Sequence, residues 1–148
     1  MSIAKRSTAK AGGLRVVLDS NVYISAFTHR QGRIFRLWSI AIESRYQVLI
    51  SHAIVAEMAG VLRKTFSWPD EEILQQVKLV VRTAEIIAPT FTLAVFSGPQ
   101  EADNRILECA VAGKADLIVS GDRDLQRLKT YQNIPIIRPM EALRTLGG

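Results

Sequence analysis

The sequence has a single cysteine, Cys109, and no uninterrupted apolar stretch near the about 20 residues that cross a bilayer. One cysteine excludes an intramolecular disulfide and a zinc site built from several cysteines, and it suits a reducing compartment. The N-terminus also lacks the apolar core of a secretory signal peptide. We therefore expect a soluble, cytoplasmic protein that has no membrane contact and needs no disulfide to fold.

The length and composition are those of one globular domain. The 148 residues fit the commonest domain size, about 100–150 residues. Hydrophobic residues make up 48% of the chain and charged residues 22%, which excludes a disordered or fibrous protein. The net charge is +5, and Lys5, Arg6 and Lys10 lie close to the N-terminus. We expect residues 1–13 to form a flexible basic leader, either solubilising or phosphate-attracting, and residues 14–148 to form a single domain.

Short apolar segments rich in β-branched residues predict the strands. They are Leu14–Leu18, Gln47–Ile50, Glu85–Ala88, Leu117–Val119 and Ile134–Ile137. Their near-continuous apolar character is typical of strands covered on both faces. Longer segments with the helical period lie between them, and this alternation predicts right-handed crossovers and a parallel sheet between two helical layers. The segment Pro89–Gln100 has no clear pattern and is left as a loop.

Two acidic segments each follow a predicted strand. Asp19 comes directly after the first strand, in LDSNV, and Asp122 follows the fourth strand, in LIVSGDRDL, with Asp124 two residues later. In an open parallel sheet, ligands bind in the crevice beyond the carboxyl ends of the strands. These acids are therefore candidates for a functional site, although Asp19 and Asp122 could instead cap the helices that follow them.

Helix geometry adds two acids at core-facing positions. Asp103 lies three residues before Ile106 and four before Leu107, in the middle of the stripe that should face the sheet. Glu57 lies on the flank of the buried stripe of its own helix. A carboxylate at such a position is costly unless it is paired or bound to a metal. Stabilisation by the helix N-terminus is the alternative explanation for Asp103.

Four carboxylates in one pocket are suited to holding a divalent cation. Close carboxylates repel one another at neutral pH, and Mg²⁺ or Mn²⁺ relieves the repulsion because hard cations choose oxygen ligands. His29 and His52 are expected at the surface, and Cys109 is expected to be packed or partly exposed rather than nucleophilic. Carboxylate-held cations serve in-line displacement at phosphorus, which needs no protein nucleophile.

The order of the motifs LDSNV, SHAIVAEMAGVL and EADNRILECAVAGKADLIVSGDRDL resembles that of the PIN-domain ribonucleases. Within them, the resemblance is to the VapC-like toxin components of bacterial and archaeal toxin–antitoxin pairs. It spans about residues 14–146, and the stretch from Asp103 to the SGD motif is the most specific part. The resemblance implies a three-layer α/β/α sandwich around a parallel sheet of about five strands in the order 3-2-1-4-5.

The resemblance also assigns roles to individual residues. The catalytic acids that would bind Mg²⁺ (or Mn²⁺) are Asp19, Glu57, Asp103 and Asp122, with Asp124 as a further metal ligand. Asn21 and Ser120 would support the site, and Ser51 would cap the helix that carries Glu57. Gln126 stands where relatives commonly have an apolar residue, and Glu101 is the only acid directly ahead of Asp103.

The expected function is that of a Mg²⁺- or Mn²⁺-dependent endoribonuclease, which hydrolyses RNA phosphodiesters by in-line attack of metal-activated water. The candidate RNA-binding residues are Arg33, Arg36 and Arg123. The expected partners are the RNA substrate, a cognate antitoxin and a second copy of the chain. Two alternatives stay open: an RNA- or antitoxin-binding module without turnover, and a phosphohydrolase of the haloacid dehalogenase type. The latter needs an aspartate where this chain has Asn21.

Overall fold

The computed structural model describes residues 13–147, so the predicted leader lies outside the described residues except for Gly13. The strands are β1 (Arg15–Leu18), β2 (Gln47–Ile50), β3 (Glu85–Ile86), β4 (Leu117–Val119), β5 (Thr130–Tyr131) and β6 (Ile134–Ile137). The helices are α2 (Ser20–Thr28), α3 (Arg33–Ile42), α4 (His52–Lys64), α5 (Asp70–Thr83), α6 (Asp103–Ala112), α7 (Arg123–Leu128) and α8 (Pro139–Gly147), with a 3-10 turn at Gly98–Gln100. None of the helices in this part of the chain has the length and apolar character to span a bilayer.

The sheet has the order β3-β2-β1-β4-β6-β5. The five predicted strands and their neighbour order are confirmed, although β3 ends two residues earlier than expected. The sixth strand, β5, was missed, and because it pairs antiparallel with β6 the sheet is mixed rather than wholly parallel. The turn between them has Gln132 and Asn133 at positive φ. Two residues are too few to show a strand pattern in the sequence.

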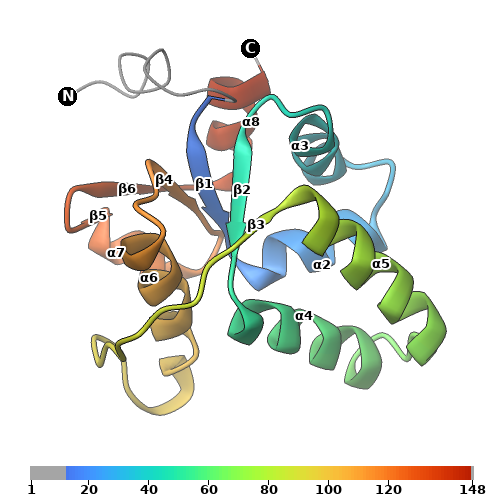
Figure 1. Cartoon of the computed structure of the whole chain (residues 1–148), viewed down its shortest axis with the longest axis horizontal. Coiled ribbons are helices and arrows are strands. Elements are labelled where there is room, and N and C mark those ends of the chain that lie inside the picture. Colours follow the sequence, from blue (N-terminus) through green and yellow to red (C-terminus); the bar gives the residue numbers. More distant parts are fainter. Residues whose placement is uncertain (1–12, 148) are drawn as a thin grey trace.

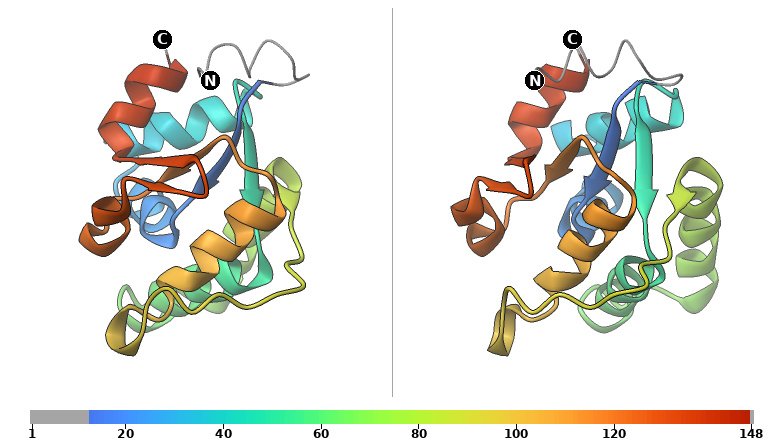
Figure 2. Two further views of the ribbon diagram at one scale, coloured as in Figure 1. Left: turned by 90° about the vertical axis from the view of Figure 1, so that its left-hand side faces the viewer. Right: turned by 60° about the vertical axis from the view of Figure 1, so that its left-hand side comes forward.

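Helices cover both faces of the sheet, which confirms the predicted three-layer architecture. On one face α6 packs on β1 and β2, and on the other α3 packs against both α2 and α8 (Figures 1 and 2). The chain runs from β1 outward to β2 and β3, and then returns through α6 to β4 on the other side of β1. Such a reversal opens a crevice at the carboxyl ends of the two central strands.

The core fixes the position of α2, which begins at that crevice. The apolar residues of β1, β2 and β4 are fully buried, and the aromatic side chain of Tyr23 on α2 packs edge-on against Trp38 of α3 at 5.6 Å between ring centroids. Phe27, one turn later on α2, meets the same Trp38 ring at 6.0 Å. Edge-to-face pairs of this kind contribute beyond their buried area. They hold α2 against α3.

The loop between β3 and α6 is held by two polar side chains of α6. Asn104 Oδ1 accepts hydrogen bonds from the amides of Val95 and Phe96, at 3.0 and 2.9 Å. One turn later, Glu108 Oε2 accepts from the amide of Leu93 at 2.8 Å. Both side chains are buried, so each bond is shielded from water. These bonds fix the first turn of α6, which begins at Asp103.

Two glycines offer a matched test of the packing that positions α6. A Cβ added at Gly113, which ends α6, would lie 2.9 Å from Leu49 Cδ1 and 3.0 Å from the backbone oxygen of Cys109. Gly113→Ala should therefore lower the free energy of unfolding by about 1–3 kcal/mol, measured by urea denaturation. A Cβ at Gly60, inside α4, meets nothing within 4 Å. Gly60→Ala should instead raise it by roughly 0.5–1 kcal/mol, and a loss there would contradict this packing.

Candidate metal centre

The first acid lies where β1 and β4 end side by side. Leu18 and Val119 are opposite each other in this parallel pair, and the amide of Asp19 donates to the backbone oxygen of Val119 at 2.9 Å. Ser120 follows Val119, and its hydroxyl donates to Asp19 Oδ2 at 2.6 Å. Asp19 and Ser120 are both buried. The two neighbouring strands thus hold one carboxylate in a fixed orientation.

Asp19 precedes α2 but does not cap it. Its backbone is extended, as at an N-cap, yet its side chain makes no capping hydrogen bond. Oδ1 accepts from the hydroxyl of Ser20 at 3.3 Å. Burial raises the pKa of Asp19, the hydrogen bond from Ser120 opposes that rise, and the negative charge of Asp122 adds to it. The Asp19 carboxylate is held by the hydroxyls of Ser120 and Ser20, and it lies close enough to Asp122 for their charges to interact.

Asp122, in contrast, does cap a helix. Its Oδ1 accepts from the amides of Asp124 and Leu125, at 2.8 and 3.2 Å, and so closes the first turn of α7. Its own amide donates to the hydroxyl of Ser120 at 3.0 Å. One hydroxyl therefore connects the two acids, donating to Asp19 and accepting from the backbone of Asp122. The cap occupies Oδ1 and fixes the direction of the other carboxylate oxygen.

Asp122 also belongs to a group of three carboxylates. Asp103, Asp122 and Asp124 each offer one oxygen, and these oxygens lie within 4.8 Å of one another. Asp103 comes from α6 on one face of the sheet, whereas the other two belong to the start of α7. Burial, followed by the charges of Asp122 and Asp19, raises the pKa of Asp103 to about 7. The position of Asp103 among other anions agrees with the predicted core-facing orientation.

The donor set fits a hard divalent cation. Asp103 Oδ2 is buried and has no hydrogen-bond partner among residues 13–147. An unpartnered carboxylate oxygen beside two further carboxylates is costly unless a cation or a proton neutralises it. Oxygen-only ligands select Mg²⁺, Mn²⁺ or Ca²⁺ over zinc. Three of the predicted acidic ligands, Asp103, Asp122 and Asp124, therefore form a group that could hold a cation, and the assignment of Asp19 and Glu57 as ligands stays a prediction.

Glu57 stands at the edge of the site. It is exposed on α4 rather than core-facing as expected, because it lies on the flank of the buried stripe, and it is outside the three-carboxylate group. Burial, then the charge of Asp19, raises the pKa of Glu57, and a hydrogen bond from Ser20 opposes the rise. The hydroxyl of Ser20 therefore lies between Glu57 and Asp19. Sequence reasoning missed Ser20, whose only signal was its place directly after Asp19.

The remaining candidates are spread more widely. Asn21 is exposed on α2. Its backbone amide, rather than its side chain, interacts with Asp19 and lowers the pKa of that carboxyl. Arg33 and Arg36 are exposed on α3, a helix that carries none of the candidate acids. Arg36 forms a salt bridge with Glu43 at 3.6 Å. Arg123 is exposed next to Asp122. These RNA-binding assignments stay predictions.

Three residues outside the site also have clear outcomes. The predicted Ser51 cap is confirmed, since its hydroxyl accepts from the amide of Ile54 at 3.4 Å. His52 is exposed, as expected. Cys109 is fully buried, which removes the expectation of partial exposure, and burial raises the pKa of its thiol to about 12. A buried thiol with that pKa is a poor nucleophile.

Removing the Ser120 hydroxyl tests how the site is held. Ser120→Ala leaves Asp19 Oδ2 buried without its donor, which should cost about 1–3 kcal/mol of stability. Because Asp19 then loses its fixed orientation, the affinity of the acidic cluster for Mn²⁺ should fall by roughly tenfold, measured by calorimetric titration. Ser39→Ala on α3, which removes a hydroxyl bonded to the backbone oxygen of Phe35, is the matched control. Equal Mn²⁺ affinity of the two variants would contradict a positioning role for Ser120.

Comparison with known proteins places this geometry in context. A family model described as the PIN domain matches residues 15–124, from β1 into α7. Among solved structures, the chain is similar to one from the crystal structure of VapBC2 from Rickettsia felis bound to a DNA fragment from their promoter. The TM-score is 0.60 at 15% sequence identity, covering 84% of this chain and 98% of that chain, and this likeness concerns the fold. No curated protein matches the sequence.

Proposed function

Since the chain belongs to the PIN-domain family of nucleases, we propose that it is a divalent-metal-dependent endoribonuclease and the toxin component of a toxin–antitoxin pair. One observation carries the proposal: carboxylate oxygens from Asp103, Asp122 and Asp124 converge within 4.8 Å of one another. Asp19 lies beside them and raises the pKa of Asp103. This cluster is the kind of oxygen-rich site that phosphodiester hydrolysis by a metal requires.

In the proposed site, each acid has its own part in binding Mg²⁺ or Mn²⁺. Asp19 is oriented by Ser120, and Asp122 by its capping bonds, so both present oxygens without reorganisation. Asp103 and Asp124 complete the set, and Glu57 faces it from α4. When bound, a divalent cation neutralises the carboxylates, polarises the phosphate and lowers the pKa of water. The protein supplies the geometry and no covalent nucleophile.

The proposed substrate is RNA, as the resemblance to PIN-domain ribonucleases implies. Two cations adjoin the acids: Arg123 is exposed next to Asp122, and Arg127 Nη1 lies 3.3 Å from Asp124 Oδ1. Cations at the rim of a metal site can hold the phosphates on either side of the reacting one. The chain as a whole carries a net charge of +5, which favours approach of a polyanion.

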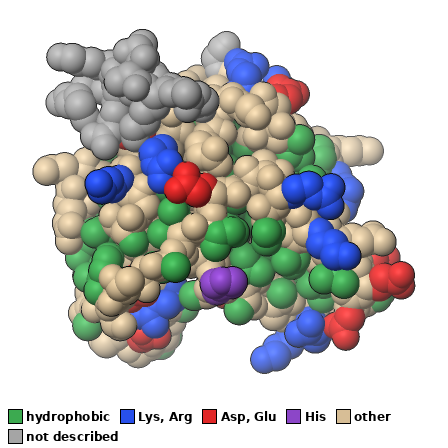
Figure 3. Space-filling view, viewed as in Figure 1, with side chains coloured by type: hydrophobic (Ala, Val, Ile, Leu, Met, Phe, Trp, Pro, Cys, Tyr) green, Lys and Arg blue, Asp and Glu red, His purple; other side chains and the backbone are tan. Residues whose placement is uncertain are grey.

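A cognate antitoxin and a second copy of the chain are the proposed partners. The similar R. felis structure is described as VapBC2 bound to promoter DNA, which supports a partner protein by analogy. Hydrophobic side chains gather across the middle of one face of the molecule (Figure 3). Large exposed apolar residues include Leu74 and Val81 of α5 and Ile86 of β3. Exposed apolar surface of this kind is typical of protein–protein contacts.

Metal-dependent cleavage by the purified protein is the test of this function. Wild type is expected to cut single-stranded RNA with Mg²⁺ or Mn²⁺ and not with EDTA, and Asp19→Asn is expected to be inactive. Equal degradation by both proteins would mean that a contaminant is acting and the proposal is wrong. Binding without cleavage would instead support a module without turnover. Hydrolysis of a small phosphomonoester but not RNA would favour a dehalogenase-type enzyme, against which the PIN-domain match argues.

A further inference from the structure

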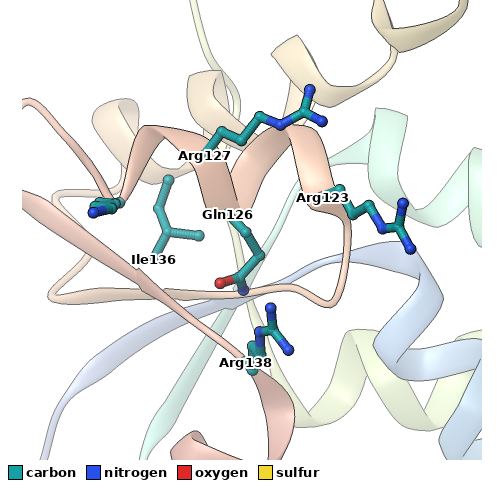
Figure 4. Close-up of a pocket in the computed structure, with 6 residues that line it drawn as sticks. Arg123, Gln126, Arg127, Ile136 and Arg138 are labelled. Carbon is teal, nitrogen blue, oxygen red and sulfur yellow. The ribbon is translucent and has the colours of Figure 1, made fainter.

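A basic pocket lies between α7 and β6 and adjoins the acids through the ion pair of Arg127 with Asp124. Its volume is about 460 Å³ (Figure 4). The residues that line it are Arg123, Gln126, Arg127, Lys129, Ile136 and Arg138. Four of these six carry a positive charge, and none carries a negative one. A concave surface with this lining is suited to an anion.

Most of this positive charge is not neutralised by the protein. Arg127 pairs with Asp124, at 3.3 Å. Within the described part of the chain, Arg123, Lys129 and Arg138 form no salt bridge, since no carboxylate lies within 4.0 Å of their basic groups. Several cations around one hollow repel one another unless an anion lies between them. Guanidinium groups pair bidentately with phosphate oxygens, which makes a phosphate group the best-matched anion.

The pocket is built on the same elements as the metal centre. The side-chain amide of Gln126 donates to the backbone oxygen of Ser120, whose hydroxyl bonds to Asp19. The amide of Ile136 donates to the backbone oxygen of Lys129 at 2.9 Å, which closes the wall formed by β6. Figure 4 shows Gln126 and Arg138 directed toward each other from α7 and the end of β6. The pocket and the acids are therefore fixed relative to each other.

We propose that this pocket binds a backbone phosphate of the RNA next to the phosphate held at the metal centre. The inference rests on the proposed function, and it names the path that the substrate takes past α7. That helix has six residues and is about 9 Å long. Asp122 and Asp124 face the carboxylate cluster, whereas Arg123 and Arg127 line the pocket. Arg138 reaches the same hollow from a segment distant in sequence.

The salt dependence of RNA binding tests this path. A fluorescein-labelled single-stranded RNA of ten nucleotides is titrated in EDTA, so that nothing is cleaved, and its anisotropy is followed from low to high salt. The test variant is Arg123→Gln with Arg138→Gln. The control is Lys78→Gln with Arg82→Gln, which changes the net charge equally at two exposed positions on α5. All four side chains are exposed, so both variants should fold.

Loss of the one phosphate contact should lower the slope of log Kd against log salt by roughly 0.7, because each phosphate contact to a single strand contributes roughly 0.7. Binding at low salt should weaken by roughly tenfold, and the α5 control should match wild type. Equal slopes for the two variants, or a pocket variant like wild type, would overturn the inference. The inference would also be overturned if inorganic phosphate bound at the pocket while the pocket variant bound RNA with unchanged affinity. Cleavage by wild type in Mn²⁺ is assayed separately, so failure of the proposed nuclease activity is distinguishable from failure of the pocket.

Discussion

Asp103→Asn should lower metal-dependent RNA cleavage by roughly 10²- to 10³-fold, and it should stabilise the metal-free fold at pH 8. Both effects have one cause. Burial and the neighbouring charges of Asp122 and Asp19 raise the pKa of Asp103 to about 7, so its carboxylate is unfavourable in the fold unless a cation is present. Asn keeps the shape and removes the charge. Functional sites commonly combine activity with local instability in this way.

Initial cleavage rates and thermal melting in EDTA measure the two effects of Asp103→Asn. The stabilisation should be about 1 kcal/mol, because Asp103 is only half-buried and solvent screens its charge. Glu101→Gln is the control, since Glu101 is exposed and pairs with Arg105 at 3.1 Å. It should cleave RNA like wild type. An Asp103→Asn protein that cleaves normally, or that melts below wild type at pH 8, would contradict this assignment.

Saturating Mn²⁺ should raise the melting temperature by roughly 5–10 °C at pH 8 and by less at pH 5. Ligand at a hundredfold excess over Kd adds about 2.7 kcal/mol to stability. The pH dependence follows from Asp103, whose pKa is raised from 3.8 to about 7 by folding. Between these values the folded protein holds a proton that the unfolded chain has lost, so metal-free stability falls as pH rises through that window and stays low above it. The cation replaces the proton.

Differential scanning calorimetry with and without Mn²⁺ at the two pH values measures this coupling. The raised pKa values of Asp19 and Glu57 act in the same direction as that of Asp103. Asp70→Asn is the control, because Asp70 is exposed on α5 and pairs only with Arg63 in the part of the chain described. It should keep the full Mn²⁺ effect, and Asp103→Asn should lose most of it. A shift of equal size at both pH values would show that Mn²⁺ acts elsewhere.

Local patterns predicted the sheet and the direction of the acids. Buried strands have continuous apolar segments, so four of the five predicted strands have the expected final residue. Helical period placed Asp103 on the inner side of α6, and the structure brings it to Asp122 and Asp124. The parallel pairing of β1 with β4 brings Asp19 close enough to Asp122 for their charges to interact.

Features that depend on distant contacts were not predictable. Asp122 both caps α7 and belongs to the acidic cluster, so the two interpretations of it were not alternatives. Gln126 looked like a departure from the family pattern, and only the structure shows its bond to the backbone of Ser120. Cys109, which was expected to be packed or partly exposed, is completely buried on α6, the helix that packs against β1 and β2. Arg138 reaches the basic pocket through the pairing of β6 with β4.

Anomalous diffraction from a crystal of wild-type protein soaked in Mn²⁺ tests the central claim most directly. The account predicts a strong Mn²⁺ peak bounded by carboxylate oxygens of Asp103, Asp122 and Asp124, with Asp19 adjoining it. The same soak of Asp103→Asn should show a much weaker peak or none. A wild-type crystal with no peak among these side chains, or with its strongest peak elsewhere on the molecule, would contradict the account.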